Sequence, residues 1–128
     1  MPASYRIDVK RRRVVEVFSG EVKLEEVLAI QSELRRDPLF DQDFDVIVDL
    51  SEMVRTKITF QSINQAVTSG ELNPFSKISR SAVVAPGELG YGMARMVEAV
   101  HKGGTFEILR SMSEAEAWLA QPTKEEAS

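Results

Sequence analysis

The sequence predicts an α/β domain in which helices pack against a mostly parallel, mixed sheet. Residues 44–50 form a run dominated by branched apolar side chains, which is typical of a strand buried on both faces. From that run onward, short apolar stretches alternate with segments of helical periodicity, a pattern that favours parallel strands joined by right-handed crossovers. Two strand patterns precede the first helix. The predicted order is therefore ββαβαβαβα, with about five strands and about four helices.

The chain begins with a predicted antiparallel hairpin. Apolar and charged residues alternate over residues 5–9, the pattern of a half-buried strand, and residues 14–18 form a second strand that ends at Ser19-Gly20. The link between them is too short for a crossover, so the first strand should be the antiparallel member of the sheet. We interpret the basic cluster in the link, residues 10–13, as a solvated turn that keeps the sheet edge soluble. An anion or acidic-lipid patch is the alternative.

Two predicted helices flank the central strand. The first spans residues 23–36 and ends at Asp37-Pro38, because the residue before a proline disfavours helical backbone angles. The second begins at Thr59, a good N-cap residue, and ends near Gly70. The segment 49–59 leaves the central strand at its carboxyl end, where open α/β sheets place their working sites.

The last four predicted elements are shorter. Residues 82–85 and 105–109 are apolar runs that predict strands, and a helix with apolar residues on one face from 89 to 100 lies between them. Gly92 in this helix is expected to permit close packing on the sheet. Ser113 is expected to cap the final helix, because an acidic residue follows three positions later in the capping-box pattern.

Length and composition limit the classes of function. The 128 residues suit one domain, predicted over 1–120, with a polar, frayed tail over 121–128. The net charge of −4 argues against a nucleic-acid binder, and the absence of cysteine excludes disulfides, thiol catalysis and Cys-ligated metal. The sequence has no signal-peptide core and no apolar run of roughly 20 residues. We therefore expect a cytoplasmic protein with peripheral membrane contact at most.

No metal site is predicted. Asp41, Asp43 and Asp45 partly imitate a calcium loop, but Val46 occupies the position where the sharp turn of such a loop needs glycine. We therefore expect a solvated acidic loop at this place. His101, the single histidine, is expected to face solvent or to cap the third helix.

No catalytic residues are predicted either. Nothing in the sequence assembles a nucleophile, a base and an orienting group, and there is no phosphate-binding GxxxxGK[ST] loop. An enzyme would require Asp49, Arg55 and His101 to converge in space. The chain is therefore predicted not to be an enzyme and to need no cofactor.

Several short motifs follow one another along the chain. They are Phe18-Ser19-Gly20, Asp37-Pro38 with Phe40, Val48-Asp49-Leu50-Ser51, Ala82-Val83-Val84-Ala85-Pro86, Tyr91-Gly92-Met93-Ala94-Arg95-Met96 and Glu114-Ala115-Glu116-Ala117-Trp118-Leu119. In this order and spacing, the chain from about residue 5 to residue 119 resembles the STAS domain of anti-sigma factor antagonists. The closer likeness is to the small SpoIIAA-like proteins grouped between STAS and the lipid-binding CRAL-TRIO domains. The resemblance implies a single-domain STAS (SpoIIAA)-like fold.

The resemblance does not extend to the phosphorylation motif. In phosphorylatable STAS proteins, a kinase anti-sigma factor modifies a serine in an Asp-Ser-Ser/Thr-Gly motif that opens the helix after the central strand. Here residues 56–60 read TKITF, so the likeness implies the fold and not the switch. Thr59 could still accept a phosphate that pairs with Lys57 or Arg55, and the alternative is that Thr59 only caps the helix. The candidate phosphoacceptor or partner surface comprises Ser51, Arg55, Thr56, Lys57 and Thr59.

The CRAL-TRIO side of the resemblance implies a small apolar ligand or contact with a membrane. The expected site is a groove between the second and third helices, where methionines suit an adaptable apolar surface. Its candidate lining comprises Phe60, Ile63, Val67, Phe75, Met93, Met96 and Val97. The alternative is that these residues are plain hydrophobic core, since a stripe at helical spacing also packs helices together.

The function predicted from the sequence is that of a non-catalytic, STAS-like regulatory or binding module. It would act through a protein partner, and a homodimer is one form of such an interaction. The alternative is a carrier or sensor of a small apolar, lipid-like ligand, with or without peripheral contact with a membrane.

Overall fold

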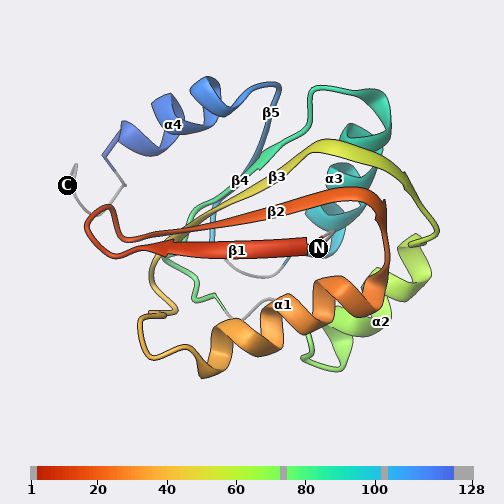
Figure 1. The fold of residues 1–128 in the computed structure, drawn as a ribbon, viewed down its shortest axis with the longest axis horizontal. Coiled ribbons are helices and arrows are strands. Elements are labelled where there is room, and N and C mark those ends of the chain that lie inside the picture. Colours follow the sequence, from red (N-terminus) through yellow and green to blue (C-terminus); the bar gives the residue numbers. More distant parts are fainter. Residues whose placement is uncertain (1–2, 73–74, 102–103, 123–128) are drawn as a thin grey trace.

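The computed structural model describes residues 3–72, 75–101 and 104–122. Over these residues, five strands and four helices follow one another in the predicted order (Figure 1). They are β1 (Ala3–Asp8), β2 (Arg13–Val22), α1 (Leu24–Arg36), β3 (Asp45–Thr56), α2 (Phe60–Thr68), β4 (Ser81–Val84), α3 (Glu88–Val100), β5 (Phe106–Leu109) and α4 (Met112–Ala120). Residues 123–128 of the predicted tail lie outside the described residues.

The strands form one mixed sheet in which their order in space is their order in the chain, β1-β2-β3-β4-β5. β1 pairs with β2 in antiparallel fashion, and the later neighbouring pairs are parallel. In register, Val14, Val46, Ser81 and Phe106 lie side by side across β2 to β5. The predicted α/β class and the antiparallel first strand are confirmed.

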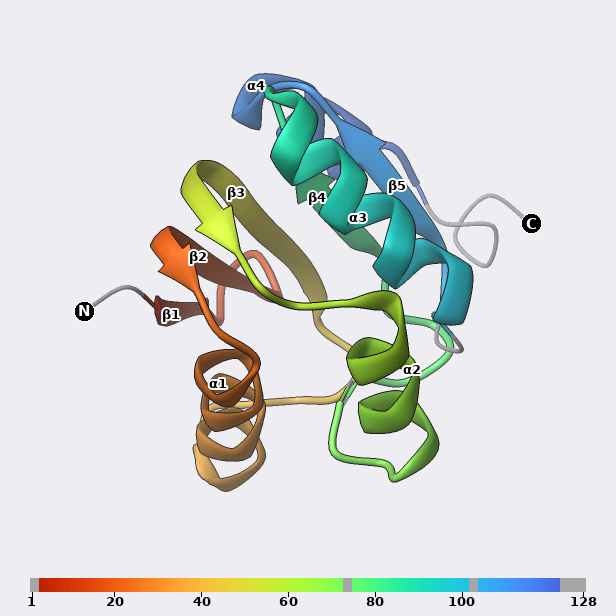
Figure 2. The same ribbon diagram turned by 90° about the vertical axis from the view of Figure 1, so that its right-hand side faces the viewer.

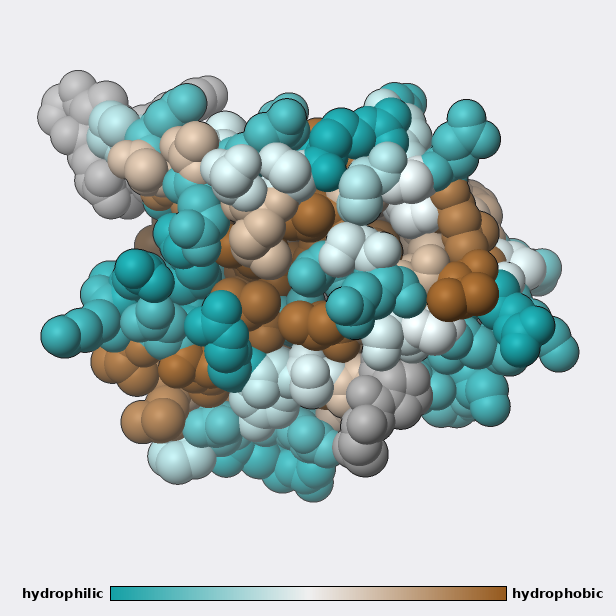
Figure 3. Space-filling model, turned by 45° about the horizontal axis from the view of Figure 1, so that its top comes forward, coloured by the Kyte–Doolittle hydropathy of each residue, from teal (hydrophilic) through white to brown (hydrophobic). Residues whose placement is uncertain are grey.

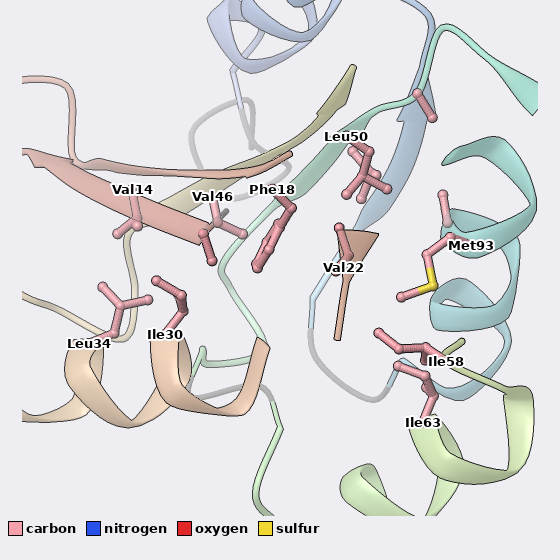
Figure 4. Packing of buried hydrophobic residues seen from close by; sticks show 14 of the residues in the cluster. Val14, Phe18, Val22, Ile30, Leu34, Val46, Leu50, Ile58, Ile63 and Met93 are labelled. Atoms are coloured by element: carbon pink, nitrogen blue, oxygen red, sulfur yellow. The ribbon is translucent and has the colours of Figure 1, made fainter. Parts of the chain in front are cut away.

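Three helices cover one face of the sheet, and α4 lies on the other face (Figures 1 and 2). The alternation of side chains along β2 shows why two cores form. Val14 and Phe18 point to the face of α1, α2 and α3, and Figure 4 shows Val14 opposite Leu34 of α1. Val15 points to the other face and is buried with Ala115 of α4. Figure 3 is tilted toward this second face and shows hydrophobic residues near the centre of the view, among hydrophilic ones.

Both long strands run further than the sequence predicts. β2 does not end at Ser19-Gly20 but continues to Val22. Gly20 adopts a φ of 66°, and the register between β2 and β3 shifts on either side of it, so the strand bulges and goes on. β3 continues to Thr56, which pairs with Val22. The segment that leaves the central strand is therefore an extension of the sheet.

Two local predictions about the later helices are wrong. α4 has Ser111 rather than Ser113 as its N-cap, and the Ser111 hydroxyl accepts a hydrogen bond from the Glu114 backbone N–H at 3.1 Å. In α3, Gly90 rather than Gly92 permits close packing. A Cβ atom at Gly90 would meet a side chain of the sheet at 3.4 Å, whereas Gly92 is exposed and would meet nothing within 4 Å.

The acidic segment that leads into the first residue of β3 is held by protein contacts and not by solvent alone. Asp43 Oδ1 accepts a hydrogen bond from Ser76 Oγ at 2.6 Å, and Asp45 Oδ2 lies 2.7 Å from Arg80 Nη2. The Arg80 guanidinium also donates to two carbonyl groups at the end of α4, which fastens that helix to the sheet. The prediction of a solvated loop is therefore wrong at these two aspartates. Among the described residues, no group of three or more metal-ligating side chains occurs.

Candidate functional site

A cavity of about 410 Å³ lies between the sheet and helices α1, α2 and α3. This volume falls within the range of small-molecule sites in proteins. The sheet contributes Phe18, Val48, Leu50 and Val83 to its apolar wall, and the helices contribute Val27, Ile63, Val67, Met93 and Val97. Figure 4 shows Phe18 and Leu50 on the sheet side of this region and Ile63 and Met93 on the helix side.

The floor of the cavity is a row of register partners on three parallel strands. Glu16 of β2 is aligned with Val48 of β3, which is aligned with Val83 of β4. Residues aligned in this way point to the same face of a sheet, and all three line the cavity. Gln31 of α1 covers the Glu16 end of the row, whereas α3 packs against β3 and β5. The cavity is the space that these two helices and α2 leave above the row.

Glu16 places a carboxyl group in this apolar wall. The residue is 2% exposed, and Gln31 Nε2 donates a hydrogen bond to Glu16 Oε1 at 3.2 Å. Burial raises the pKa of Glu16 from 4.5 to about 7, because the charged form loses its hydration, and the hydrogen bond from Gln31 partly opposes this rise. Near neutral pH, the carboxyl group therefore exists in both its neutral and its charged form.

His101 brings a second titratable group to the cavity wall. It occupies the C-cap position of α3, and its Nε2 lies 3.1 Å from the carbonyl oxygen of Gly104. Because a carbonyl only accepts, Nε2 carries the proton and donates. Burial lowers the pKa of His101 from its ordinary value, which favours the neutral ring, and the hydrogen bond to Gly104 partly opposes this shift. The ring packs against Phe106, with 5.0 Å between centroids, so it does not simply face solvent.

Solved structures share this arrangement of strands and helices. An uncharacterized protein of the DUF3478 family from Shewanella loihica PV-4, described as having a SpoIIAA-like fold, matches with a TM-score of 0.59 and 15% identity over 91% of each chain. The anti-sigma factor antagonist SpoIIAA in its unphosphorylated form matches with a TM-score of 0.59 and 13% identity, over 94% of this chain and 99% of that chain. The chain has a SpoIIAA-like fold. The predicted STAS (SpoIIAA)-like fold is thereby confirmed.

Sequence comparisons add no closer relative to this SpoIIAA-like domain. No protein-family model matches the chain, and no curated protein matches it.

Most residues predicted for the apolar groove line the cavity of the SpoIIAA-like domain. Those that do are Ile63, Val67, Phe75, Met93 and Val97. Phe60 is instead 49% exposed, and Met96 packs against the core without lining the cavity. The sheet and α1, which were not part of the predicted groove, form much of the wall. The signal for Glu16 lay in the alternation of β2, where a charged residue occupies an inward position between Val14 and Phe18.

The residues predicted as a phosphoacceptor or partner surface are spread from the middle of β3, where Ser51 lies, to the start of α2. Ser51, Arg55, Lys57 and Thr59 are exposed, and Thr56 is half-buried. Thr59 is the N-cap of α2, as predicted. Its Oγ1 accepts from the Ser62 backbone N–H at 3.2 Å, and Ser62 Oγ accepts from the Thr59 backbone N–H at 3.1 Å. Thr56 Oγ1 donates to the Val22 carbonyl at 2.8 Å, which secures the end of the strand.

The three residues whose convergence would indicate an enzyme have separate partners. Asp49 Oδ1 accepts a hydrogen bond from Ser51 Oγ at 2.6 Å, and Arg55 Nε lies 3.1 Å from a Glu21 carboxylate oxygen. His101 binds the backbone carbonyl described above. Among the described residues, these contacts join no two of the three. Within residues 3–72, 75–101 and 104–122, no helix has the length and apolar character needed to cross a membrane.

Proposed function

We propose that this SpoIIAA-like domain is a non-catalytic module that binds a small apolar molecule in the cavity. The observation that carries this proposal is a space of about 410 Å³ with mainly apolar walls in a chain of 128 residues. Small-molecule sites in proteins are clefts or cavities of about this size, lined mainly by apolar side chains. An apolar ligand would remove the cavity walls from water and would contribute about 0.8 kcal/mol for each methylene group that it buries.

The position of the cavity suits a sensor or a carrier. Its walls come from the sheet and from α1, α2 and α3, so a bound molecule would contact all three helices. α2 begins directly after the exposed segment that presents Arg55, Lys57 and Thr59. A ligand that binds only the folded arrangement would stabilise this segment together with the helices.

The first experiment measures the mass of the purified protein under native and then under denaturing conditions. A small apolar species that is present in the native mass and lost on denaturation supports the proposal. The thermal unfolding midpoint is then measured with alkylbenzene and alkyl-alcohol probes, which should raise it by binding linkage. An empty native mass, together with an unchanged midpoint for every probe, contradicts the proposal.

A matched pair of variants locates the binding site. Val97 lines the cavity from α3, so Val97→Phe should fill part of the space and weaken probe binding roughly tenfold without lowering the unfolding midpoint. Val54 on β3 is 71% exposed and lies outside the cavity lining, so Val54→Phe should keep the affinity of the parent. Equal effects of the two substitutions would show that the probes bind elsewhere.

A second candidate function is the recognition of a protein partner at the end of β3 and the start of α2. Here Val54 and Phe60 are large apolar side chains that are 71% and 49% exposed, and the charged residues Arg55 and Lys57 lie between them in the chain. Exposed apolar side chains among charged ones are typical of interaction surfaces. A second copy of this chain is the simplest partner to test.

Two experiments test this surface. Sedimentation equilibrium of the parent and of a Val54→Ser, Phe60→Ser double variant asks whether a dimer forms through these side chains. A dimer that persists in the double variant would exclude this surface as its interface.

For a regulatory modification, Thr59→Glu and Thr59→Ala should bind a captured partner with different affinities. Equal binding by both variants and the parent would rule out a phosphorylation switch at Thr59.

A further inference from the structure

Glu16 is a carboxyl group at a position that the strand pattern reserves for apolar side chains. Val14, Glu16 and Phe18 alternate on the cavity face of β2 and are 0%, 2% and 2% exposed. A buried polar group that lacks a hydrogen-bond partner destabilises the folded state by about 1–3 kcal/mol. Buried polar groups of this kind call for a specific explanation, and an adjacent cavity provides one.

The pair of Glu16 and Gln31 leaves hydrogen-bond acceptors open to the cavity. Gln31 Nε2 donates to Glu16 Oε1 at 3.2 Å, and within the described part of the chain nothing donates to Glu16 Oε2 or to Gln31 Oε1. Both residues line the cavity, and each of these two oxygens keeps some accessible surface. An amide that donates through its nitrogen keeps its oxygen as an acceptor. With Glu16 in its charged form, the pair therefore matches a ligand group that donates hydrogen bonds.

The rest of the floor sets the shape of such a ligand. Val48 and Val83 continue the row that begins at Glu16, and Met93 and Val97 of α3 line the cavity as well. Because neighbouring strands lie about 4.8 Å apart, the row from Glu16 to Val83 spans roughly 10 Å. A molecule with a polar head at Glu16 and an apolar body of about this length fits the row.

Charge disfavours a ligand with a carboxylate head at this place. Next to the charged form of Glu16, such a head would bring a second negative charge into a region of low dielectric, where like charges repel strongly. Lys77 also lines the cavity, but it is exposed, so its ammonium group is hydrated. A carboxylate held by Lys77 is the opposing arrangement, and the experiment below distinguishes the two.

We infer that Glu16 and Gln31 anchor the head group of an apolar ligand, and that this head group is a hydrogen-bond donor such as a hydroxyl or an amine. The inference rests on the proposed ligand-binding function and specifies the chemistry of the ligand. It makes Glu16 a binding residue and places the apolar body of the ligand against Val48 and Val83.

The experiment compares three probes that share one apolar body, using calorimetric titration of the full chain at about pH 8, where Glu16 is mostly charged. Para-butylphenol donates a hydrogen bond, para-butylanisole has the donor replaced by a methyl ether, and para-butylbenzoate is an anion. The parent should bind the phenol roughly tenfold more tightly than the anisole and should bind the benzoate most weakly. In Glu16→Leu, the preference for the phenol over the anisole should disappear and the benzoate should gain affinity.

Two further variants control this comparison. Glu107 on β5 is exposed and does not line the cavity, so Glu107→Leu should keep the order of affinities of the parent. Glu16→Gln is nearly isosteric and keeps the shape of the cavity wall. It serves as the test variant if Glu16→Leu does not fold. It should reduce the preference for the phenol severalfold and improve the binding of the benzoate, because the negative charge is removed.

The outcomes separate the anchor from the binding function. If neither the phenol nor the anisole binds the parent, the proposed function fails and the anchor fails with it. If both bind equally, or if the Glu16 variants keep the parent's preference, ligand binding stands and the anchor is overturned. Tighter binding of the benzoate than of the phenol also overturns the anchor and would indicate Lys77 instead.

Discussion

Gln31 of α1 donates a hydrogen bond to the buried carboxyl group of Glu16 on β2, with 3.2 Å between Nε2 and Oε1. This contact joins a helix to the sheet inside the wall of the cavity. The carboxyl group proposed to hold a ligand thus also affects the stability of the fold, and its ionisation is coupled to folding.

The free energy of unfolding should therefore contain a component that decreases as the pH rises toward neutral. The pKa of Glu16 is raised from 4.5 to about 7 in the folded protein, so folding favours the protonated form. This stabilisation is complete below pH 4.5 and is lost as the pH rises through about 7, a loss of about 3 kcal/mol. Urea unfolding at about pH 5 and about pH 8 measures it.

The control for this prediction is Glu16→Gln, which cannot ionise. His101 acts in the opposite direction, because its lowered pKa favours folding of the neutral ring and adds stability as the pH rises. The informative quantity is thus the difference in the free energy of unfolding between the parent and Glu16→Gln. At the higher pH, this difference should shift in favour of the variant. A difference that is the same at both pH values would mean that the pKa of Glu16 is not raised in the folded protein.

Loss of the Arg80 side chain should destabilise the fold more than loss of other charged pairs. Arg80 and Asp45 have side chains that are only 14% and 16% exposed, with 2.7 Å between Nη2 and Oδ2. Arg80→Met leaves the aspartate without its counter-charge. It should lower the free energy of unfolding, measured by chemical denaturation, by about 3 kcal/mol. Arg95→Met, at an exposed pair with Glu98, is the control and should change stability by less than about 0.5 kcal/mol. Similar losses for both variants would contradict this prediction.

Two glycines should respond to alanine with opposite signs. A Cβ atom at Gly104 would run into the backbone carbonyl oxygens of Ser79 and Lys77, so Gly104→Ala should destabilise the protein by about 1–3 kcal/mol. Gly92 lies on the exposed side of α3 with no neighbour in the way, so Gly92→Ala should stabilise it by about 1 kcal/mol. Thermal unfolding of both variants tests the pair, and a stable Gly104→Ala would refute the close approach.

Replacement of the α2 cap should weaken the fold without touching the cavity. Thr59→Ala removes the oxygen that accepts from the Ser62 backbone N–H and should cost about 1 kcal/mol. Thr59→Asn restores a capping acceptor but carries no hydroxyl for phosphorylation, so it should unfold like the parent. The asparagine variant therefore distinguishes a structural role of Thr59 from a role as phosphoacceptor. An alanine variant as stable as the parent would show that the cap is dispensable.

The order of elements could be predicted because periodicity is a local property. The alternation in β1, the apolar run of β3 and the helical spacing in α1, α2 and α3 are each visible within a dozen residues. Predictions that depended on a partner segment were weaker. Ser19-Gly20 reads as a strand end, but pairing with β3 carries β2 through it as a bulge. Which of Gly90 and Gly92 packs on the sheet likewise depends on the rotation of α3.

The candidate site divides in the same way. The sequence by itself determined the order of strands and helices and most of the helix residues that line the cavity, because these follow from spacing along the chain. Only the tertiary structure decided that Glu16, Val48 and Val83 form one row and that Gln31 lies over its end. The physical reason is that strand register and helix placement are set by contacts between residues distant in sequence. The cavity between them therefore leaves no pattern within a short stretch of the sequence.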